Sequence, residues 1–259
     1  MVIGLNTFRE YFKDYTDSYI IIGGTACDLV IDAAGFTPRA TKDIDIILVV
    51  EAMNAAFVER FWQFIKDGQY KRREKNEEER KYYRFMEPAT EGFPYQIELF
   101  SKEPDTLNLP EEAHLTPIVV DEALSNLSAI LMDEDYYQFT MANTEIEDEV
   151  RRANKAALIC LKAKAYLENK RLKAEGKPIR TRDVVKHKYD VFRLTLLLAE
   201  ADRIETTGAI NTDMKVFVDD IKNDLPAPDI FDVMQVGAPV NVPALFEQLK
   251  KNFNLETDE

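Results

Sequence analysis

Two glycines and two aspartates near the start of the chain have the residue types needed to handle a phosphorylated ligand together with a metal ion. An apolar run at residues 19–22 leads directly into Gly23 and Gly24, and Asp43 and Asp45 follow with one isoleucine between them. Glycines that join a strand to a helix let backbone N–H groups approach a phosphate closely, and the helix N-terminus favours negative charge. Two neighbouring carboxylates favour a divalent cation because they repel each other otherwise. The pattern therefore predicts triphosphate chemistry that depends on magnesium.

Strand geometry explains why the spacing of the two aspartates matters. Side chains at i and i+2 share one face of a strand, so Asp43 and Asp45 point together out of the sheet while Ile44 and Ile46 enter the core. Magnesium takes oxygen ligands at about 2.1 Å, usually from one or two carboxylates, substrate phosphates and water. The alternative is an exposed strand with charges on its solvent face. The neighbouring glycine pair favours the metal site.

A third carboxylate lies in the later apolar segment at residues 95–100. Ile97 and Leu99 fall on one face of this expected strand and Glu98 on the other. An acid within an apolar strand costs stability if it is left unpaired. We expect Glu98 to complete the set of metal ligands and catalytic acids; the alternative is that it faces solvent or pairs with a Lys or Arg.

These residues resemble the motifs of the DNA polymerase β-like nucleotidyltransferase superfamily. Within it, the chain is most similar to the AbiEii/AbiGii-type family, the toxin side of some bacterial toxin–antitoxin and phage-defence pairs. Beyond the glycines and the first two acids, Lys162 resembles that family's helical lysine, and Lys186 with Asp190 resembles its final Lys-x-x-x-Asp. The resemblance spans about residues 19 to 198. The 18 residues between Gly24 and Asp43 require a long connection back to the sheet.

The resemblance implies transfer of a nucleoside monophosphate from an NTP to an acceptor hydroxyl, with release of pyrophosphate and with Mg²⁺ or Mn²⁺ as cofactor. It implies tRNA or protein as the acceptor and a cognate antitoxin as a partner. Lysines of the helical part would reach phosphate oxygens, and Asp190 would orient one of them. Arg39 would contact phosphate or brace the loop. The candidate nucleotide-binding residues are Gly23, Gly24, Thr25, Arg39, Lys162, Lys164, Lys186 and Asp190.

Two other functions stay open. The same fold serves small-molecule modifiers such as antibiotic nucleotidyltransferases, and a formal net charge of −14 suits that class because nucleic-acid-binding proteins are usually basic. The other alternative is a nucleotide-binding module without catalysis. Three acids suited to a metal argue against it.

Charge is distributed unevenly along the chain. Residues 151–193 contain fourteen Lys and Arg against four Asp and Glu. This segment either faces a polyanion or consists of amphipathic helices with solvated basic faces. We expect His187, alone in this lysine-rich segment, to be a surface residue.

Composition predicts a cytoplasmic protein that does not enter a membrane. Cys27 and Cys160 sit in apolar helical contexts without a Cys-x-x-Cys pair, which is typical of buried thiols in a reducing compartment. The first residues do not form a signal peptide, and no apolar run approaches the length of a membrane-spanning helix.

The periodicity of apolar residues predicts an α/β (α+β) fold, in which a small mixed β-sheet flanked by helices precedes a mainly helical C-terminal part. We expect a nucleotidyltransferase domain at residues 1–146 and a helical domain at 147–259 that contributes basic residues to the cleft. Asp183 is expected to be a helix N-cap. The expected elements are helices at 5–15, 25–34, 51–66, 153–173, 183–201, 213–224 and 242–253, and strands at 19–22, 44–50, 82–86, 95–100 and within 118–141.

Overall fold

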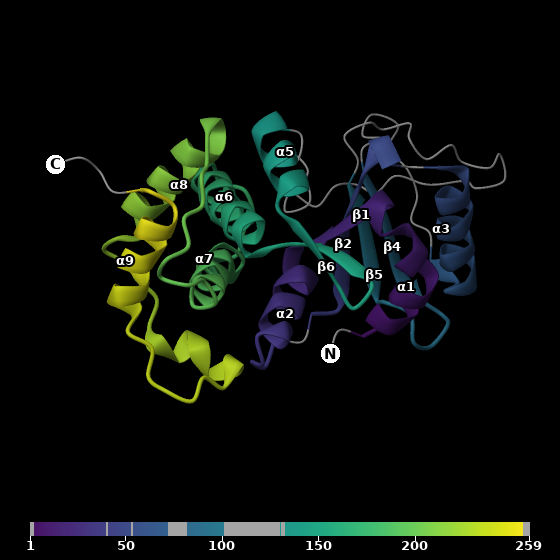
Figure 1. Ribbon diagram of the computed structural model, residues 1–259, viewed down its shortest axis with the longest axis horizontal. Coiled ribbons are helices and arrows are strands. Elements are labelled where there is room, and N and C mark those ends of the chain that lie inside the picture. Colours follow the sequence, from purple (N-terminus) through teal and green to yellow (C-terminus); the bar gives the residue numbers. More distant parts are fainter. Residues whose placement is uncertain are drawn as a thin grey trace. The chain divides into compact units, whose positions relative to one another are not determined.

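The computed structural model describes residues 3–39, 41–52, 54–71, 82–100, 130 and 133–255. The fold is α+β, with a mixed sheet flanked by helices, as predicted (Figure 1). The chain forms two compact units. Unit 1 is drawn from residues 1–28, 40–121 and 144–153, and unit 2 from residues 29–39, 122–143 and 154–259.

Unit 1 is built on the sheet, whose seven described strands run in the order β3-β4-β5-β2-β1-β7-β6. The strands are β1 (Tyr19–Ile22), β2 (Asp43–Leu48), β3 (Tyr70–Lys71), β4 (Tyr82–Pro88), β5 (Gln96–Phe100), β6 (Thr144–Glu147) and β7 (Val150–Ala153). Strand β2 pairs antiparallel with β1 and parallel with β5, and β5 pairs antiparallel with β4. The two aspartates and Glu98 therefore lie on neighbouring strands at the centre of the sheet.

An aromatic core fixes one face of this sheet. Helices α1 (Leu5–Phe12) and α3 (Ala55–Asp67) pack against each other, and Phe12 contacts both Phe64 of α3 and Tyr19 of β1. Ile44 and Ile46 are almost fully buried, as the alternation in β2 predicts. Tyr19 and Ile46 share this face, because Tyr19 is in register with Leu48. The acids of β2 consequently belong to the opposite face.

Capping residues explain the bounds of α3. The Asn54 side chain accepts a hydrogen bond from the N–H of Phe57 at 2.9 Å, which satisfies one of the free donors at the helix start. Gly68 is the C-cap, directly after the last helical residue, Asp67.

Unit 2 is mainly helical. Its helices are α5 (Glu134–Ala142), α6 (Lys155–Ala174), α7 (Thr181–Thr195), α8 (Gly208–Ile221) and α9 (Val242–Asn252), with a 3₁₀ segment η3 (Pro228–Met234). Helix α6 packs against both α7 and α8. Helix α2 (Gly23–Ala33) begins in unit 1, and its residues from Leu29 onward belong to unit 2. The short 3₁₀ segments η1 (Lys13–Ser18) and η2 (Val50–Ala52) belong to unit 1.

Three local predictions are wrong. The aromatic run from Tyr136 was expected to end a strand, but it lies in α5, where the acceptor side chain of Asp133 starts the helix and helical spacing buries Tyr136 and Thr140. Aromatic and β-branched residues favour strands only weakly, so packing overrides them. The hairpin β6–β7 was missed because charged residues obscure its alternation. Asp183 lies in the first turn of α7, whose N-cap is Arg180. The earlier part of the strand expected within 118–141 lies outside the described residues.

The two units interleave along the sequence. Residues 144–153 join the sheet of unit 1 through β6 and β7, and residues 29–39 belong to unit 2. Neither unit is one continuous segment. The functional division at residue 146, with catalysis before it and basic residues after it, stays a prediction.

Candidate functional site

Three charged side chains form one row across the sheet of unit 1. Asp45 of β2 is in register with Glu98 of β5, and Glu98 is in register with Arg84 of β4. Directly opposite residues of paired strands present their side chains on the same face. Asp43 lies two residues before Asp45 and so shares this face. The three acids singled out from the sequence are therefore brought together.

Glu98 is held tightly within this row. It is 7% exposed, and its Oε1 accepts hydrogen bonds from Nε of Arg84 at 2.8 Å and from Nε2 of Gln96 at 2.5 Å. Nη2 of Arg84 also lies 2.8 Å from Oε1. Of the alternatives left open by the sequence, pairing with an arginine is thus realised, and a solvent-facing Glu98 is not.

Burial raises the pKa of Glu98 to about 8. The negative charge of Asp45 and a hydrogen bond with that carboxyl act in the same direction, as does the charge of Asp43, while the guanidinium of Arg84 opposes them. Burial and the neighbouring acids together thus favour the protonated form of Glu98.

The donor set suits a divalent cation, although the side chains do not enclose one. Within the described ranges, no group of three or more Asp, Glu, His or Cys side chains is arranged to hold a metal ion. Carboxylate oxygens are nevertheless the ligands that Mg²⁺ and Mn²⁺ prefer, and the charges of Asp45 and Asp43 add to the effect of burial on the pKa of Glu98. Asp43, Asp45 and Glu98 fit the cation by their chemistry. Their role as ligands stays a prediction.

Gly23 is required by the position of Asp45. Its φ is +69°, and a Cβ atom built on it would lie 1.8 Å from Oδ2 of Asp45. No side chain fits there without displacing the aspartate. Gly24 is less constrained, since a Cβ there would meet the Thr41 side chain at 3.0 Å. The glycine pair thus leaves room for the carboxylate at the start of α2.

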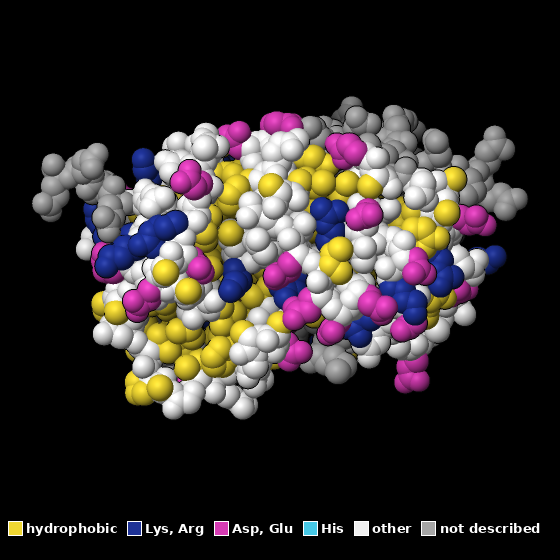
Figure 2. Space-filling model, in the orientation of Figure 1, with side chains coloured by type: hydrophobic (Ala, Val, Ile, Leu, Met, Phe, Trp, Pro, Cys, Tyr) yellow, Lys and Arg dark blue, Asp and Glu magenta, His cyan; other side chains and the backbone are white. Residues whose placement is uncertain are grey.

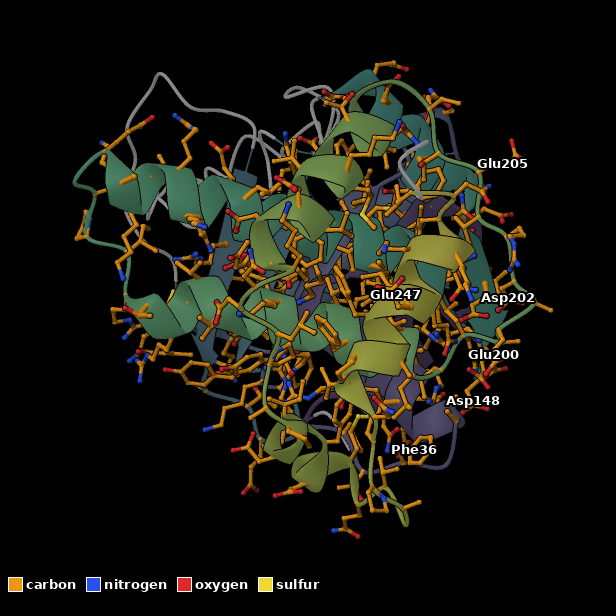
Figure 3. The ribbon with its side chains drawn as sticks, turned by 90° about the vertical axis from the view of Figure 1, so that its left-hand side faces the viewer. Phe36, Asp148, Glu200, Asp202, Glu205 and Glu247 are labelled. Atoms are coloured by element: carbon orange, nitrogen blue, oxygen red, sulfur yellow. The ribbon has the colours of Figure 1, made fainter. Side chains whose placement is uncertain are left out.

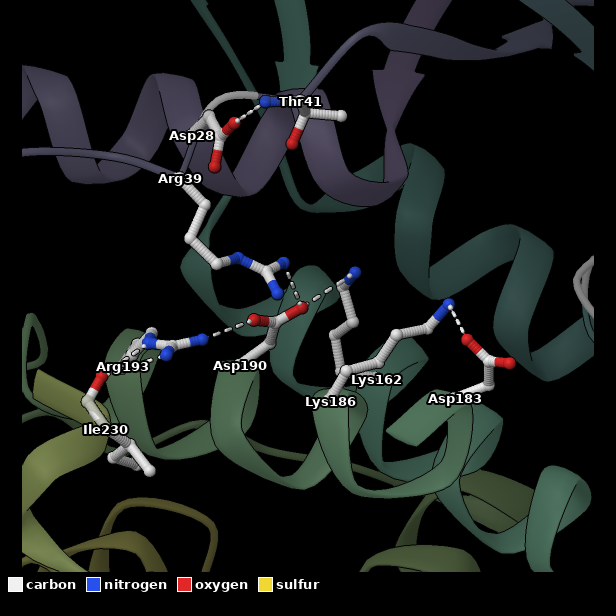
Figure 4. Close-up of polar contacts among 9 residues, drawn as sticks. All are labelled: Asp28, Arg39, Thr41, Lys162, Asp183, Lys186, Asp190, Arg193 and Ile230. Carbon is white, nitrogen blue, oxygen red and sulfur yellow. Dashed lines mark hydrogen bonds and ion pairs between the residues drawn. The ribbon is translucent and has the colours of Figure 1, made fainter. Parts of the chain in front are cut away.

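The start of α2 is tied to the segment that leads into β2. The buried hydroxyl of Thr25 donates to the carbonyl oxygen of Asp43, and the N–H of Thr41 donates to Oδ2 of Asp28 at 2.9 Å (Figure 4). The Thr25 side chain therefore braces β2, and its role in binding nucleotide stays a prediction. The 18-residue spacing between Gly24 and Asp43 accommodates α2 and this return segment.

Unit 2 contains a buried carboxylate with three cationic partners. Asp190 of α7 is 3% exposed. Its Oδ2 lies 2.9 Å from Nη2 of Arg39 and 3.2 Å from Nζ of Lys162, and its Oδ1 lies 3.2 Å from Nη1 of Arg193 (Figure 4). Arg193 also donates to the carbonyl oxygen of Ile230. The interpretation that Asp190 orients a helical lysine agrees with this geometry, and Arg39 braces the same carboxylate.

Three cationic side chains lie around the carboxylate of Asp190. Burial pushes the pKa of Asp190 upward, but Lys162, Arg39 and Arg193 together outweigh it and hold the pKa below its usual value. Burial and the charges of Lys162 and Lys186 lower the pKa of His187 well below its usual value, so the imidazole is neutral. The cluster of Arg39, Lys162, Arg193 and Asp190, called the Asp190 cluster below, thus suits an anion.

Each of the other two candidate lysines of unit 2 lies next to an acid other than Asp190. Lys164 pairs with Asp213 of α8 at 2.9 Å, and Lys186 lies 3.6 Å from Asp183. Of the two candidate lysines on α6, Lys162 thus pairs with Asp190 and Lys164 with Asp213. His187 was expected at the surface, but its Nδ1 is buried and has no hydrogen-bond partner among the described residues.

Most of the basic segment is neutralised by nearby acids. Arg171 pairs with Glu168 and Glu175, and Lys170 pairs with Asp220 at 2.6 Å. Basic and acidic side chains are interspersed on the face shown in Figure 2. Most Lys and Arg side chains at 151–193 therefore pair with nearby acids. This favours the interpretation of the segment as amphipathic helices with solvated basic faces.

Unit 2 also carries exposed acids. Glu200 and Glu205 follow α7, and Glu247 projects from α9 (Figure 3). Exposed negative charge repels a polyanion. These three acids therefore oppose contact of a polyanion with this part of unit 2.

Sequence reasoning missed Arg84, Gln96, Arg193 and Asp28. Arg84, Arg193 and Asp28 are placed by contacts with residues distant in the sequence, which local patterns do not reveal. Gln96 contacts Glu98 two residues away in the same strand. The alternation at residues 82–86 places Arg84 on one face of a strand, and the β4–β5 alignment was needed to place it beside Glu98.

No protein-family model matches the chain, and no curated protein matches it significantly. The helices described by the structure include none that is both long enough and apolar enough to cross a membrane.

Gly23→Ala should perturb the acidic row far more than Gly35→Ala. Both glycines have positive φ, at +69° and +81°, but only at Gly23 would the new methyl group meet a side chain. We expect Gly23→Ala to weaken Mn²⁺ binding at least about tenfold, as displacement of groups around a metal typically does, and Gly35→Ala to leave it unchanged. Titration calorimetry measures both. Equal effects of the two substitutions would show that only backbone strain matters.

Glu98→Gln should gain stability relative to the wild type as the pH rises. Between about pH 5 and 8 the folded wild type keeps a proton on Glu98 that the unfolded chain has released. The unfolded state then binds fewer protons, so the wild-type free energy of unfolding falls through this window, by on the order of a few kcal/mol. The glutamine variant has no titrating group at position 98, so its free energy of unfolding lacks this decrease. Urea denaturation without divalent cations at pH 5, 6.5 and 8 tests it, with the exposed Glu59→Gln as control. Parallel pH profiles for Glu98→Gln and the wild type would contradict the assignment.

Proposed function

We propose that the chain is a metal-dependent nucleotidyltransferase that transfers a nucleoside monophosphate from an NTP to an acceptor hydroxyl. The observation that carries this proposal is the register pairing of Asp45 with Glu98, beside Asp43 and against Gly23, where a Cβ atom would collide with Asp45. Two buried or half-buried carboxylates placed opposite each other destabilise a sheet unless they serve a bound cation or share a proton. Gly23, where no side chain would fit, leaves the space that the Asp45 carboxylate occupies.

Asp43, Asp45 and Glu98 would hold Mg²⁺ or Mn²⁺. When bound, the metal neutralises triphosphate charge and aligns the groups for in-line displacement. Backbone N–H groups at Gly23 and Gly24 would donate to phosphate oxygens at the start of α2. The acceptor oxygen attacks the α-phosphorus, and the bond to the bridging oxygen of pyrophosphate breaks.

Glu98 would help to activate the acceptor hydroxyl by accepting its proton. Asp45 would orient that carboxyl through the contact between the two side chains. Alignment and charge stabilisation would supply most of the barrier reduction.

The Asp190 cluster would bind triphosphate oxygens. It is supported by the three cations around one carboxylate and by the 3.2 Å pairing that positions Lys162. Lys164 and Lys186 are weaker candidates because each has its own acid.

The acceptor and partners follow from the resemblance. A tRNA or protein acceptor, and a cognate antitoxin, would make the chain the toxin of a bacterial toxin–antitoxin or phage-defence pair. The exposed acids at Glu200, Glu205 and Glu247 favour a small acceptor instead, as in an antibiotic-type enzyme.

A nucleotide-binding module without transfer chemistry is the second candidate. The specific observation in its favour is that Glu98 is already engaged by Arg84 and Gln96, and that the described acids do not enclose a metal ion. Such a module would bind NTP without releasing pyrophosphate.

Replacing Asp43 and Asp45 together by Asn should abolish nucleotide transfer and leave the fold intact. The change keeps side-chain size but removes both charges that would bind metal. Incubation with each labelled NTP, Mg²⁺, and RNA, protein or small-molecule fractions measures the labelled product and pyrophosphate. The matched control is Asp14→Asn with Asp17→Asn, which removes two exposed acids from unit 1. Wild-type rates in the Asp43 and Asp45 variant would refute the proposal, and NTP binding without any labelled product would favour the second candidate.

Lys162→Gln should weaken binding of NTP at least about tenfold, whereas Lys164→Gln should leave it nearly unchanged. Both lysines lie on α6, but only Lys162 belongs to the Asp190 cluster. Loss of a charge-assisted contact to phosphate typically costs about 1.5–3 kcal/mol. Calorimetric titration with NTP measures the affinities, and thermal unfolding controls for stability. Equal affinities in both variants would exclude a phosphate role for Lys162.

A further inference from the structure

We propose that Arg84 is a positioning residue that keeps the Glu98 carboxylate in place as a metal ligand. This inference rests on the proposed function, because it assigns a role within the same acidic row. Arg84 has no counterpart among the motifs that the resemblance supplied.

Strand register aligns the two groups. Arg84 and Glu98 are directly opposite on antiparallel strands, and two nitrogen atoms of the guanidinium lie 2.8 Å from Oε1. The side chains of Arg84 and Glu98 are only 15% and 9% exposed. A fork of donors from a neighbouring strand, largely screened from water, fixes the direction of a carboxylate better than a surface ion pair does.

The hydrogen bonds from Arg84 and Gln96 end on the same carboxylate oxygen of Glu98. Arg84 and Gln96 donate to Oε1, while Asp45 is the register partner of Glu98 on the strand at its other side. The Glu98 carboxyl also makes a hydrogen bond with that of Asp45. Arg84 therefore holds Glu98 in the orientation that keeps it beside Asp45.

Two effects of Arg84 on metal binding oppose each other. Its positive charge repels a cation, but that charge is offset by Glu98 itself. Removal of the Arg84 side chain would leave the buried Glu98 carboxylate without its main hydrogen-bond donor. This is strongly unfavourable, so the Glu98 side chain would move out of the row. Loss of an oriented ligand is then the larger effect. Outer groups that orient metal ligands typically contribute about 10–100-fold to metal affinity.

The test is Mn²⁺ binding to the whole protein without nucleotide, followed by electron paramagnetic resonance. We expect Arg84→Gln to weaken binding at least about tenfold and Arg84→Lys, which keeps the charge but loses the fork, to weaken it less. The matched control is Arg152→Gln. Arg152 is a buried arginine of the same sheet that pairs with Glu145 and Glu147. Its register partner is Ile21, whose side chain lies on the face opposite Asp45.

A double-mutant cycle shows whether Arg84 acts through Glu98. Arg84→Gln should have little further effect once Glu98→Gln is present, because the carboxylate it positions is gone. The double variant replaces a buried ion pair by a neutral pair, so it can fold even if Arg84→Gln alone unfolds. In that case Arg84→Lys, with and without Glu98→Gln, measures the effect of Arg84 on Mn²⁺ binding.

Unchanged or tighter Mn²⁺ binding in Arg84→Gln would overturn the inference while leaving the proposed function in place. An equal loss with and without Glu98 would overturn it as well, since Arg84 would then act on the fold. Absence of Mn²⁺ binding in the wild type would overturn both this inference and the proposed function. If Arg84→Gln unfolds, unchanged binding in Arg84→Lys overturns the inference.

Discussion

The local structure of unit 1 depends on two carboxylates held opposite each other in a parallel strand pair. Asp45 and Glu98 cannot move apart, because the register of β2 and β5 fixes their backbones and apolar neighbours bury both strands. Their repulsion must be offset where it arises. Arg84 offsets part of it from β4, and Gly23 makes room for Asp45 by lacking a side chain. These features are explained by one electrostatic constraint.

Unit 2 shows the opposite arrangement. One buried carboxylate, Asp190, gathers the cationic side chains of Arg39, Lys162 and Arg193. Buried charges of one sign in excess are expensive unless a ligand of the other sign is bound for part of the time. A bound anion would compensate the cations around Asp190 in unit 2, as a bound cation would compensate the acids of unit 1. The two units, each considered by itself, thus differ in the sign of the ligand that their charges favour.

Local patterns predicted the elements of this site better than its contacts. Alternation and the glycine pair were enough to place β1, β2 and β5, because those signals lie within a few residues. The partner of Glu98 could not be predicted, since a register shift of one residue in β4 would have put Arg84 on the other face. The choice of Lys162 over Lys164 likewise required the packing of α6 on α7. The aromatic residues of α5 indicated a strand, but the cap at Asp133 and the burial of one helix face stabilise a helix instead.

A proton and a divalent cation are alternative ways to compensate the acidic row. With the pKa of Glu98 at about 8, the metal-free protein keeps a proton near neutral pH. A metal ligand must be deprotonated, so cation binding would release that proton. Arg84 can stay beside Glu98 when a cation binds, because its N–H groups donate to Oε1 only. The row is therefore suited to exchange a proton for a metal while its arginine stays in place, which keeps Glu98 oriented in both states.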